Sequence, residues 1–310
     1  MMNVLPKVSV VMAVYNGGEY LRLAIESVLK QTYTDFEFII INDGSTDKSL
    51  EVLNEYALQD QRLRIISREN RGLVASLNEG ITEAKSPLIA RMDADDICLP
   101  ERLVEQVEFL YKYEDIACVG TAQIIIDDEG DELTTLNVPT DDCEIQEKLL
   151  QGHCPIEHPS VMFRTDIVRA LNGYRKEFEA AEDYDLWLRL GEIGKLANIN
   201  KPLIKYRYLG SSISAANQSK QRESTKRACL QAWERRGITG QFKANSEWRA
   251  SQERASKLSF VLKFGWWAYN YKNRHAAIKY AKRAIALVPW CTEAWKLLAL
   301  SFFKLEQVDR

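Results

Sequence analysis

Three aspartates stand within four residues, at Asp93, Asp95 and Asp96, shortly after the apolar run 87–90. Like charges so close together repel one another, and burial beside a strand end adds to the cost unless a cation is shared. Hard divalent ions such as Mg²⁺ and Mn²⁺ prefer such oxygen ligands, usually together with substrate phosphates. The alternative is an acidic turn in which Asp96 and Pro100 begin a helix. Taken alone, the segment predicts either a cation site or a helix cap.

A second acidic group lies in the segment 182–190, where Glu182, Asp183 and Asp185 are followed by apolar residues at helical spacing. If Asp183 opens this helix, its carboxylate lies at a helix N-terminus, where negative charge is stabilised. A plain N-cap explains the same residue equally well. A carboxylate that lies apart from a metal site could also act as a general base.

Short apolar runs alternate with amphipathic segments in the first part of the chain, which predicts strand–helix units. Strands are expected at 8–14, 36–41, 63–67 and 88–91, and helices at 20–30, 47–58 and 73–84, the second helix capped by Ser45 or Thr46. This alternation predicts an α/β fold with a mostly parallel central sheet flanked by helices. Such sheets bind ligands at the carboxyl ends of their strands, where polar residues collect in this chain, at 15–16, 43–44, 69–72 and 93–96.

The pattern changes after residue 116. The runs 116–126 and 133–137 flank an acidic turn and predict a hairpin, followed by a helix at 142–150, a strand at 160–163 and a helix at 183–190. Residues 217–310 are expected to be mostly helical, and 275–304 predicts two helices broken by Pro289. Those two helices loosely match a tetratricopeptide unit.

Charge is distributed unevenly along the chain. Residues 1–216 contain 22 Lys and Arg against 37 Asp and Glu, whereas 217–310 contain 19 against 7 and six of the seven tryptophans. This break predicts two domains, 1–216 and a basic, Trp-rich helical extension at 217–310.

The six cysteines are scattered without a CxxC pair, which fits a reducing cytoplasm. His153, Cys154 and His158 lack a second ligand pair, so a zinc site there is disfavoured. The sequence contains no signal-like segment and no apolar stretch long enough to span a bilayer.

The turn after the first strand excludes two familiar nucleotide-binding classes. Its sequence, 14–19, lacks the GxGxxG spacing of a dinucleotide-binding dehydrogenase, and the chain contains no P-loop. A cation would then have to balance phosphate charge, which favours the metal interpretation of Asp93–Asp96. Tyr15 could stack on a base and Asp43 could accept a base N–H, although packing and a simple turn explain each of them alone.

Five ordered blocks resemble the family 2 glycosyltransferases, which are inverting enzymes with the GT-A (nucleotide-diphospho-sugar transferase) fold. The blocks are PKVSVVMAVYNGGEYLRLAIESVLKQTYTDFEFIIINDGSTD, ENRGLVASLNEGI, MDADD, HPSVMFR and EDYDLWLRL, and together they span about residues 5–210. The resemblance does not extend to 217–310.

The resemblance implies roles for individual residues. Ala13 and Tyr15 would line the nucleotide base, Asp43 would bond the uracil edge and Arg71 would lie near base or diphosphate. Asp93 would contact the ribose or donor sugar, Asp95 would hold the Mn²⁺ or Mg²⁺, and Asp183 would be the general base. Asp96, Glu182 and His158 would border the active site or acceptor. Ala13 replaces a frequent hydroxyl residue, so only apolar or backbone contact with the base is expected there.

These expectations describe a cytoplasmic, metal-dependent, inverting glycosyltransferase. It would move a sugar from a UDP-sugar to a saccharide or lipid-linked acceptor, in bacterial surface polysaccharide or glycolipid synthesis. A nucleotidyltransferase of similar fold would need a basic loop after the first strand, which 16–19 lacks. The remaining alternative is a non-catalytic nucleotide-sugar-binding scaffold that acts through its helical tail.

Two interpretations of the basic extension stay open. It is either a helical cap that packs on the catalytic domain, or a peripheral membrane contact at the inner face of the membrane, where Lys, Arg and Trp suit an anionic surface. Nucleic acid is not expected as a partner, because the acidic residues 1–216 would repel phosphate.

Overall fold

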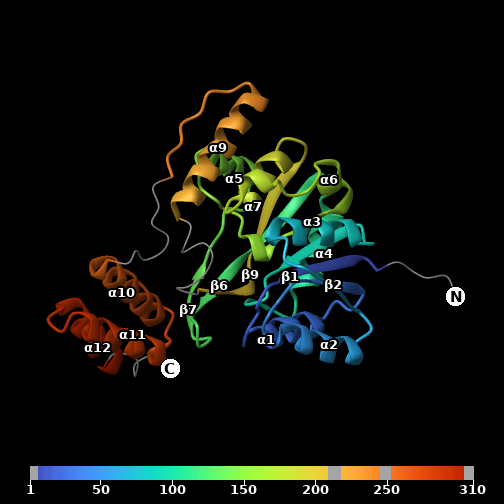
Figure 1. Ribbon diagram of the computed structural model, residues 1–310. Helices are drawn as coiled ribbons and strands as arrows, with labels where there is room; N and C mark the ends of the chain where they lie inside the picture. Colours follow the sequence, from blue (N-terminus) through green and yellow to red (C-terminus); the bar gives the residue numbers. More distant parts are fainter. Residues whose placement is uncertain (1–5, 209–217, 245–252, 304–310) are drawn as a thin grey trace. The chain divides into compact units, whose positions relative to one another are not determined.

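The computed structural model describes residues 6–208, 218–244 and 253–303 (Figure 1). The chain divides into two compact units, of which the first contains residues 1–123, 137–205 and 219–244 and the second contains 124–136, 206–218 and 245–310. The domain boundary predicted near residue 216 falls outside the described residues and stays a prediction. No helix in the described ranges combines the length and apolar composition needed to cross a membrane.

One half of the sheet in the first unit is parallel, as expected. Its strands lie in the order β3-β2-β1-β4, with bounds Leu63–Arg68, Phe36–Asp43, Val8–Val14 and Leu88–Met92. The register pairs Val8 with Phe36 on one side and with Leu88 on the other, so all four strands end at one edge. The helices between them are α1 (Leu21–Leu29), α2 (Ser49–Gln59) and α3 (Leu73–Glu83).

The other half of the sheet contains antiparallel pairs beyond the hairpin that the sequence predicted. β8 (Met162–Arg164) pairs antiparallel with β4 and with β6 (Ile116–Ile126), and β5 (Ile97–Cys98) pairs antiparallel with β9 (Lys195–Arg207). β7 (Glu132–Leu136) pairs with β6 and completes the predicted hairpin. The strand expected at 160–163 is shorter, because residues His158–Ser160 form a 3₁₀ turn before it.

Both faces of the central strands are buried, which explains their continuous apolar runs. Val11 and Ile39 pack on one face with α3, whereas Val10 and Phe38 pack on the other with α1 and α4 (Arg102–Lys112). The first face is also covered by α5 (Asp142–Leu150), α6 (Thr165–Ala170), α7 (Glu182–Leu190) and α9 (Gln218–Arg236).

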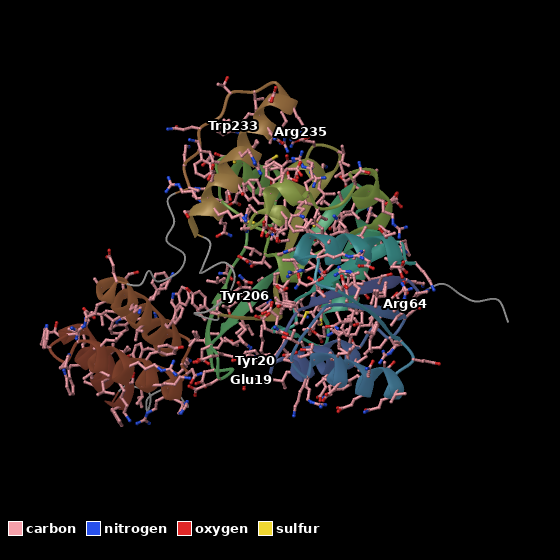
Figure 2. The ribbon with its side chains drawn as sticks, in the orientation of Figure 1. Glu19, Tyr20, Arg64, Tyr206, Trp233 and Arg235 are labelled. Carbon is pink, nitrogen blue, oxygen red and sulfur yellow. The ribbon has the colours of Figure 1, made fainter. Side chains whose placement is uncertain are left out.

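α9 packs as part of the first unit. Its residues Cys229 and Trp233 join the same apolar cluster as α5 and α7, and the indole of Trp233 donates to the Leu150 carbonyl at 3.1 Å. Arg235, labelled with Trp233 in Figure 2, forms an ion pair with Glu192 at 2.7 Å. The start of the basic region therefore supports the back of α7.

The second unit joins the β6–β7 hairpin end to three helices, α10 (Arg254–Asn270), α11 (Arg274–Leu287) and α12 (Thr292–Phe303). Phe264 and Tyr280 pack against Leu133, and Lys279 lies 2.6 Å from the Asp127 carboxylate. The predicted break at Pro289 is confirmed, and the tetratricopeptide resemblance stays a prediction.

Two helix starts differ from the expected ones. α2 begins after Lys48 without a side-chain cap, because Ser45 instead accepts a hydrogen bond from the Asn16 backbone. α4 begins after Glu101, and Asp96 lies buried before β5, so Asp96 does not cap this helix. Tertiary contacts override the local capping signal at both places.

A fully buried arginine supports the loop after β4 from below. Arg102 has no exposed surface, and its guanidinium donates to the carbonyls of Arg91 at 2.7 Å and Val161 at 3.1 Å and to Gln106 at 3.1 Å. Gln106 in turn donates to the carbonyls of Val119 and Ser160. This network ties α4 to both halves of the sheet.

Replacing Arg102 by methionine should destabilise the protein strongly, because buried carbonyls lose their donor. We expect the free energy of unfolding to fall by about 2–4 kcal/mol in urea denaturation. The control Arg22→Met removes an exposed ion pair with Glu55 and should leave the free energy of unfolding nearly unchanged. Equal losses in the two variants would contradict a stabilising role of the buried network.

Candidate functional site

Two loops at the carboxyl edge of the sheet are joined by backbone hydrogen bonds. Asn16, which has a positive φ of 53°, donates its N–H to Ser45 Oγ at 3.0 Å and accepts from the Thr46 N–H at 2.8 Å. The next two backbone N–H groups donate to Ser49 and Asp47, at 2.9 and 3.2 Å. The loops after β1 and β2 therefore form one fixed platform.

Tyr15 lies on this platform with 54% of its surface exposed, which leaves its ring accessible to a planar ligand. Ala13 is partly buried one step inside the same strand. Both residues lie where the sequence placed them, at the end of β1, and their contact with a nucleotide base stays a prediction.

Asp43 organises the neighbouring loop from the end of β2. Its carboxylate accepts the backbone N–H groups of Arg71 at 2.8 Å and Gly72 at 2.9 Å, and it forms an ion pair with Arg68. A carboxylate has about four acceptor positions, so these three donors leave about one for a ligand. Gly72 immediately precedes α3, so the charge of Asp43 also lies at a helix N-terminus.

Gly44 follows Asp43 with a φ of +72°, and a Cβ atom there would lie 2.6 Å from the Asn70 backbone nitrogen. Only glycine fits this close approach. The exposed Arg71 side chain therefore extends from a loop that is fixed by its own backbone.

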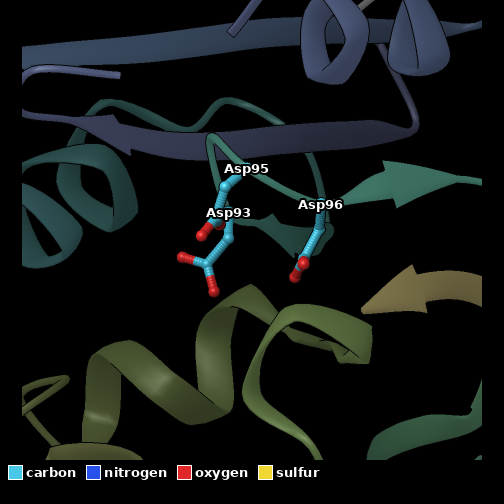
Figure 3. Close-up of side chains that lie close together, drawn as sticks. All are labelled: Asp93, Asp95 and Asp96. Atoms are coloured by element: carbon cyan, nitrogen blue, oxygen red, sulfur yellow. The ribbon is translucent and has the colours of Figure 1, made fainter. Parts of the chain in front are cut away.

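The three aspartates after β4 gather as the sequence predicted. Asp93, Asp95 and Asp96 each offer a carboxylate oxygen within 4.8 Å of the others (Figure 3). Two oxygens across an octahedral Mg²⁺ shell lie about 4.2 Å apart, so small side-chain rotations would bring these oxygens to a shared ion. The donor set of carboxylates alone suits Mg²⁺ or Mn²⁺ rather than zinc.

Arg91 lies beneath this cluster and is only 3% exposed. Its guanidinium forms an ion pair with Asp93, and its Nε has no hydrogen-bond partner among the described residues. Burial raises the pKa values of Glu182 and Asp183, and the charge of Arg91 opposes that rise. One buried cation thus acts on the aspartates after β4 and on the acidic start of α7.

α7 begins at Glu182, one residue earlier than predicted, and no side chain caps it. The half-buried Asp183 accepts the Tyr184 backbone N–H at 2.7 Å. Burial raises the pKa of Asp183, and the charge of Asp93 raises it further. The charge of Asp93 reaches Asp183, and the Arg91 beneath acts on both segments, so the aspartates after β4 and the start of α7 border a common site.

A buried ion network holds α7 in place from behind. Asp185 has no exposed surface and pairs with Arg175 and with Arg189, the latter at 2.8 Å. Arg189 also donates to the carbonyls of Leu171 and Gly173, at 2.9 and 2.7 Å. This arrangement fixes the loop before α7 relative to the helix.

His158 lies close to the same site, at 9% exposure. Its Nε2 lies 2.9 Å from the Tyr174 hydroxyl, and its ring packs edge-on against Trp187 with centroids 5.9 Å apart. Burial, followed by the charge of Arg91, lowers the pKa of His158 well below its ordinary value. The imidazole is therefore neutral at physiological pH, and its predicted place beside an acceptor stays a prediction.

The sequence interpretation missed the residues that position these groups. Asn16, Arg68, Arg91 and Tyr174 form the contacts just described, yet each looks like a surface or packing residue in the sequence. The one signal in the sequence was the position of Arg91, a cation only two residues before the carboxylate cluster Asp93–Asp96.

The raised pKa of Glu182 predicts a pH-dependent stability. Burial and the charge of Asp183 raise this pKa from 4.5 to about 7. The native state then holds a proton that the unfolded chain releases, so the free energy of unfolding falls as the pH rises from 4.5 through about 7.

Replacing Glu182 by glutamine should flatten this decline, measured as the melting temperature of the metal-free protein between about pH 5 and about pH 8. The exposed Glu114→Gln variant serves as the matched control and should keep the wild-type slope. An unchanged slope in Glu182→Gln would show that Glu182 does not titrate in this range.

Comparisons with known proteins agree with this geometry. The model of glycosyl transferase family 2 matches residues 9–171. The O-antigen biosynthesis glycosyltransferase WbnJ of Escherichia coli is 37% identical over 210 residues, 66% of this chain and 81% of that protein.

Two solved structures share the fold at low sequence identity. S. aureus TarS 1–349 in complex with UDP-GlcNAc aligns with a TM-score of 0.59 at 16% identity, over 96% of this chain and 89% of that one. The mannosyltransferase PcManGT from Pyrobaculum calidifontis, in complex with GDP-Man and Mn²⁺, aligns with a TM-score of 0.54 at 17% identity, over 96% and 79%. The fold is the GT-A fold, and the chain belongs to glycosyl transferase family 2.

Proposed function

We propose that this glycosyltransferase moves a sugar from a UDP-sugar to an acceptor hydroxyl with inversion at the anomeric carbon. The observations that support the proposal best are the ion pair of the buried Arg91 with Asp93 and the effect of both charges on Asp183. A metal-binding carboxylate cluster and a separate carboxylate with a raised pKa then open onto one site. The first would hold a cation that assists the departure of the diphosphate, and the second would be a base that assists the attack of the acceptor hydroxyl.

The donor half of the site is assigned to the platform at the ends of β1 and β2. Tyr15 and Ala13 line the base, the remaining acceptor position of Asp43 takes a base N–H, and Arg71 lies beside the diphosphate. A complex of a structural neighbour with UDP-GlcNAc supports a nucleotide-sugar donor, and the neighbour with GDP-Man makes the choice of base the first question to test.

Asp95 is assigned as the metal ligand, with Asp93 toward the ribose or donor sugar and Asp96 beside them. The carboxylate set and the Mn²⁺ in a structural neighbour support a divalent cation, Mn²⁺ or Mg²⁺. When bound, such an ion neutralises charge that grows on a departing diphosphate.

Asp183 is assigned as the general base. It accepts the proton of the acceptor hydroxyl as that oxygen attacks the sugar from the face opposite the diphosphate, so a single displacement inverts the anomeric centre. Its raised pKa brings its basicity closer to physiological pH, which favours proton transfer. Glu182 and His158 border the acceptor side, where neutral His158 offers hydrogen bonds without a charge.

The acceptor is proposed to be a saccharide or a lipid-linked saccharide of a bacterial surface polysaccharide or glycolipid. The O-antigen relative supports this class. A cytoplasmic location is supported by the six cysteines, all of which are free thiols.

Asp183→Asn should keep donor binding and lose transfer. We expect an unchanged thermal shift with the donor and a fall in UDP release of about 10²–10⁴-fold, because proton transfer is lost while the donor platform is untouched. The exposed Asp166→Asn variant serves as the control and should match the wild type. UDP release by Asp183→Asn at the wild-type rate would remove Asp183 from the reaction.

Asp95→Ala should abolish the metal dependence of nucleotide binding. In a thermal-shift panel of UDP, GDP and dTDP sugars with and without Mn²⁺, the wild type should be stabilised most by a UDP-sugar with the ion present. Asp95→Ala should give the same smaller shift with and without Mn²⁺, while the exposed Asp35→Ala keeps the wild-type response. An undiminished Mn²⁺ effect in Asp95→Ala would reassign the ligand.

A further inference from the structure

The three helices of the second unit form a strongly basic segment. Residues 254–303 contain nine Lys and Arg and a single acidic residue, Glu293. Part of this charge is balanced locally, because Lys279 and Arg283 contact the acidic turn of the β6–β7 hairpin. The rest of the charge lies away from that turn along α10, α11 and α12.

α12 exposes large aromatic side chains beside charged ones, since Lys296 lies 3.8 Å from Glu293 and both of these side chains are more than half exposed. Ala294, Leu297 and Ser301 are buried on one side of the helix. Trp295 and Phe302, seven residues apart and so on one face, are 52% and 47% exposed. Trp290, in the turn before the helix, is 75% exposed.

Cations lie directly beside aromatic rings of this helix and its neighbours. The Arg274 guanidinium lies 5.7 Å from the Phe302 ring centroid and donates to the Phe302 carbonyl at 3.2 Å. The Lys296 ammonium, next to Trp295 in the chain, lies 5.7 Å from the Trp266 ring centroid. The Trp295 indole donates to the Pro289 carbonyl at 2.8 Å, so this ring is held in place.

We propose that Trp290, Trp295, Lys296, Phe302 and Arg274, together named the α12 surface, bind an anionic lipid bilayer. Tryptophan and phenylalanine rings enter the headgroup region, where their apolar bodies leave water and the indole N–H keeps a polar partner. Lysine and arginine beside them are attracted by anionic headgroups. Exposed aromatics flanked by cations combine these two contributions on one helix.

The charge of the chain favours a membrane over nucleic acid. A nucleic-acid surface gains most of its affinity from many phosphate contacts, whereas the α12 surface has two cations among three large aromatic side chains. A bilayer is a surface that a single unit can contact through one helix face. The proposal is independent of the proposed function, because membrane binding needs neither donor nor metal.

The test is co-sedimentation of the full chain with vesicles of phosphatidylcholine alone or with about one third phosphatidylglycerol, without nucleotide sugar or metal. We expect binding to the anionic vesicles that weakens with salt and is at least about tenfold weaker on neutral vesicles. The variant W290A/W295A/F302A should reduce anionic-vesicle binding by about tenfold or more. K296E should reduce it and make the remainder less salt-sensitive.

The matched control L58A/Y111A/Y113A removes three exposed apolar side chains of the first unit, which are 90%, 56% and 40% exposed, and should bind as the wild type does. Circular dichroism confirms that each variant is folded. Absence of wild-type binding to anionic vesicles, or undiminished binding by W290A/W295A/F302A, overturns the proposal.

Two further measurements distinguish a bilayer from the two alternative partners of this surface, a second copy of the chain and nucleic acid. Light scattering across a concentration series detects a dimer, and a dimer lost in W290A/W295A/F302A without vesicle binding in the wild type would assign the surface to a second copy. Binding of single-stranded oligonucleotide that depends on the same three residues and exceeds vesicle binding would assign it to nucleic acid. Either result would overturn the proposal that this surface binds a bilayer.

Discussion

The site depends on one electrostatic constraint, which is the concentration of carboxylates around a single buried guanidinium. Asp93, Asp95 and Asp96 come from the end of β4, and Glu182 and Asp183 come from the start of α7. Without compensation, mutual repulsion and burial would protonate several of them. Arg91 pairs with Asp93, and its charge opposes the rise in pKa that burial causes at Glu182 and Asp183.

The backbone that carries this guanidinium is held in turn by interior hydrogen bonds. The Arg91 carbonyl accepts from Arg102, whose donors also reach the other half of the sheet, while Asp185 fixes α7 through two arginines. A buried ion costs desolvation energy unless its polar atoms are satisfied, and these networks satisfy most of them. The Nε of Arg91 is among the buried side-chain atoms that have no hydrogen-bond partner in the described residues, which places an unsatisfied donor beside the candidate site.

Much of the fold followed from the sequence, since apolar runs buried on both faces and helical spacing are local signals. The strands 8–14, 36–43 and 63–68 and the helices between them were predicted close to their observed bounds. In the antiparallel half only the β6–β7 hairpin pairing was predicted, because β5 has two residues, β8 has three, and their partners lie far away in the chain. The positions of the candidate site residues at strand ends also followed from local patterns.

The supporting residues could not be found in the same way. Asn16 bonds a loop about thirty residues further on, and the partners of Arg102 lie on two separate strands. The expected caps at Ser45 and Asp96 were wrong for the same reason, because distant backbone and interior packing compete for these side chains. A sequence pattern records periodicity along the chain and contains no record of such pairings.

β4 has a parallel neighbour on one side and an antiparallel neighbour on the other. The proposed donor platform belongs to the parallel half, whereas Asp183 and His158 come from segments after residue 150, beyond that seam. On the proposed assignment, the two substrates are therefore bound by structurally separate halves of one sheet. Changes in the segments beyond the seam would then alter the acceptor side and leave the donor side as it is.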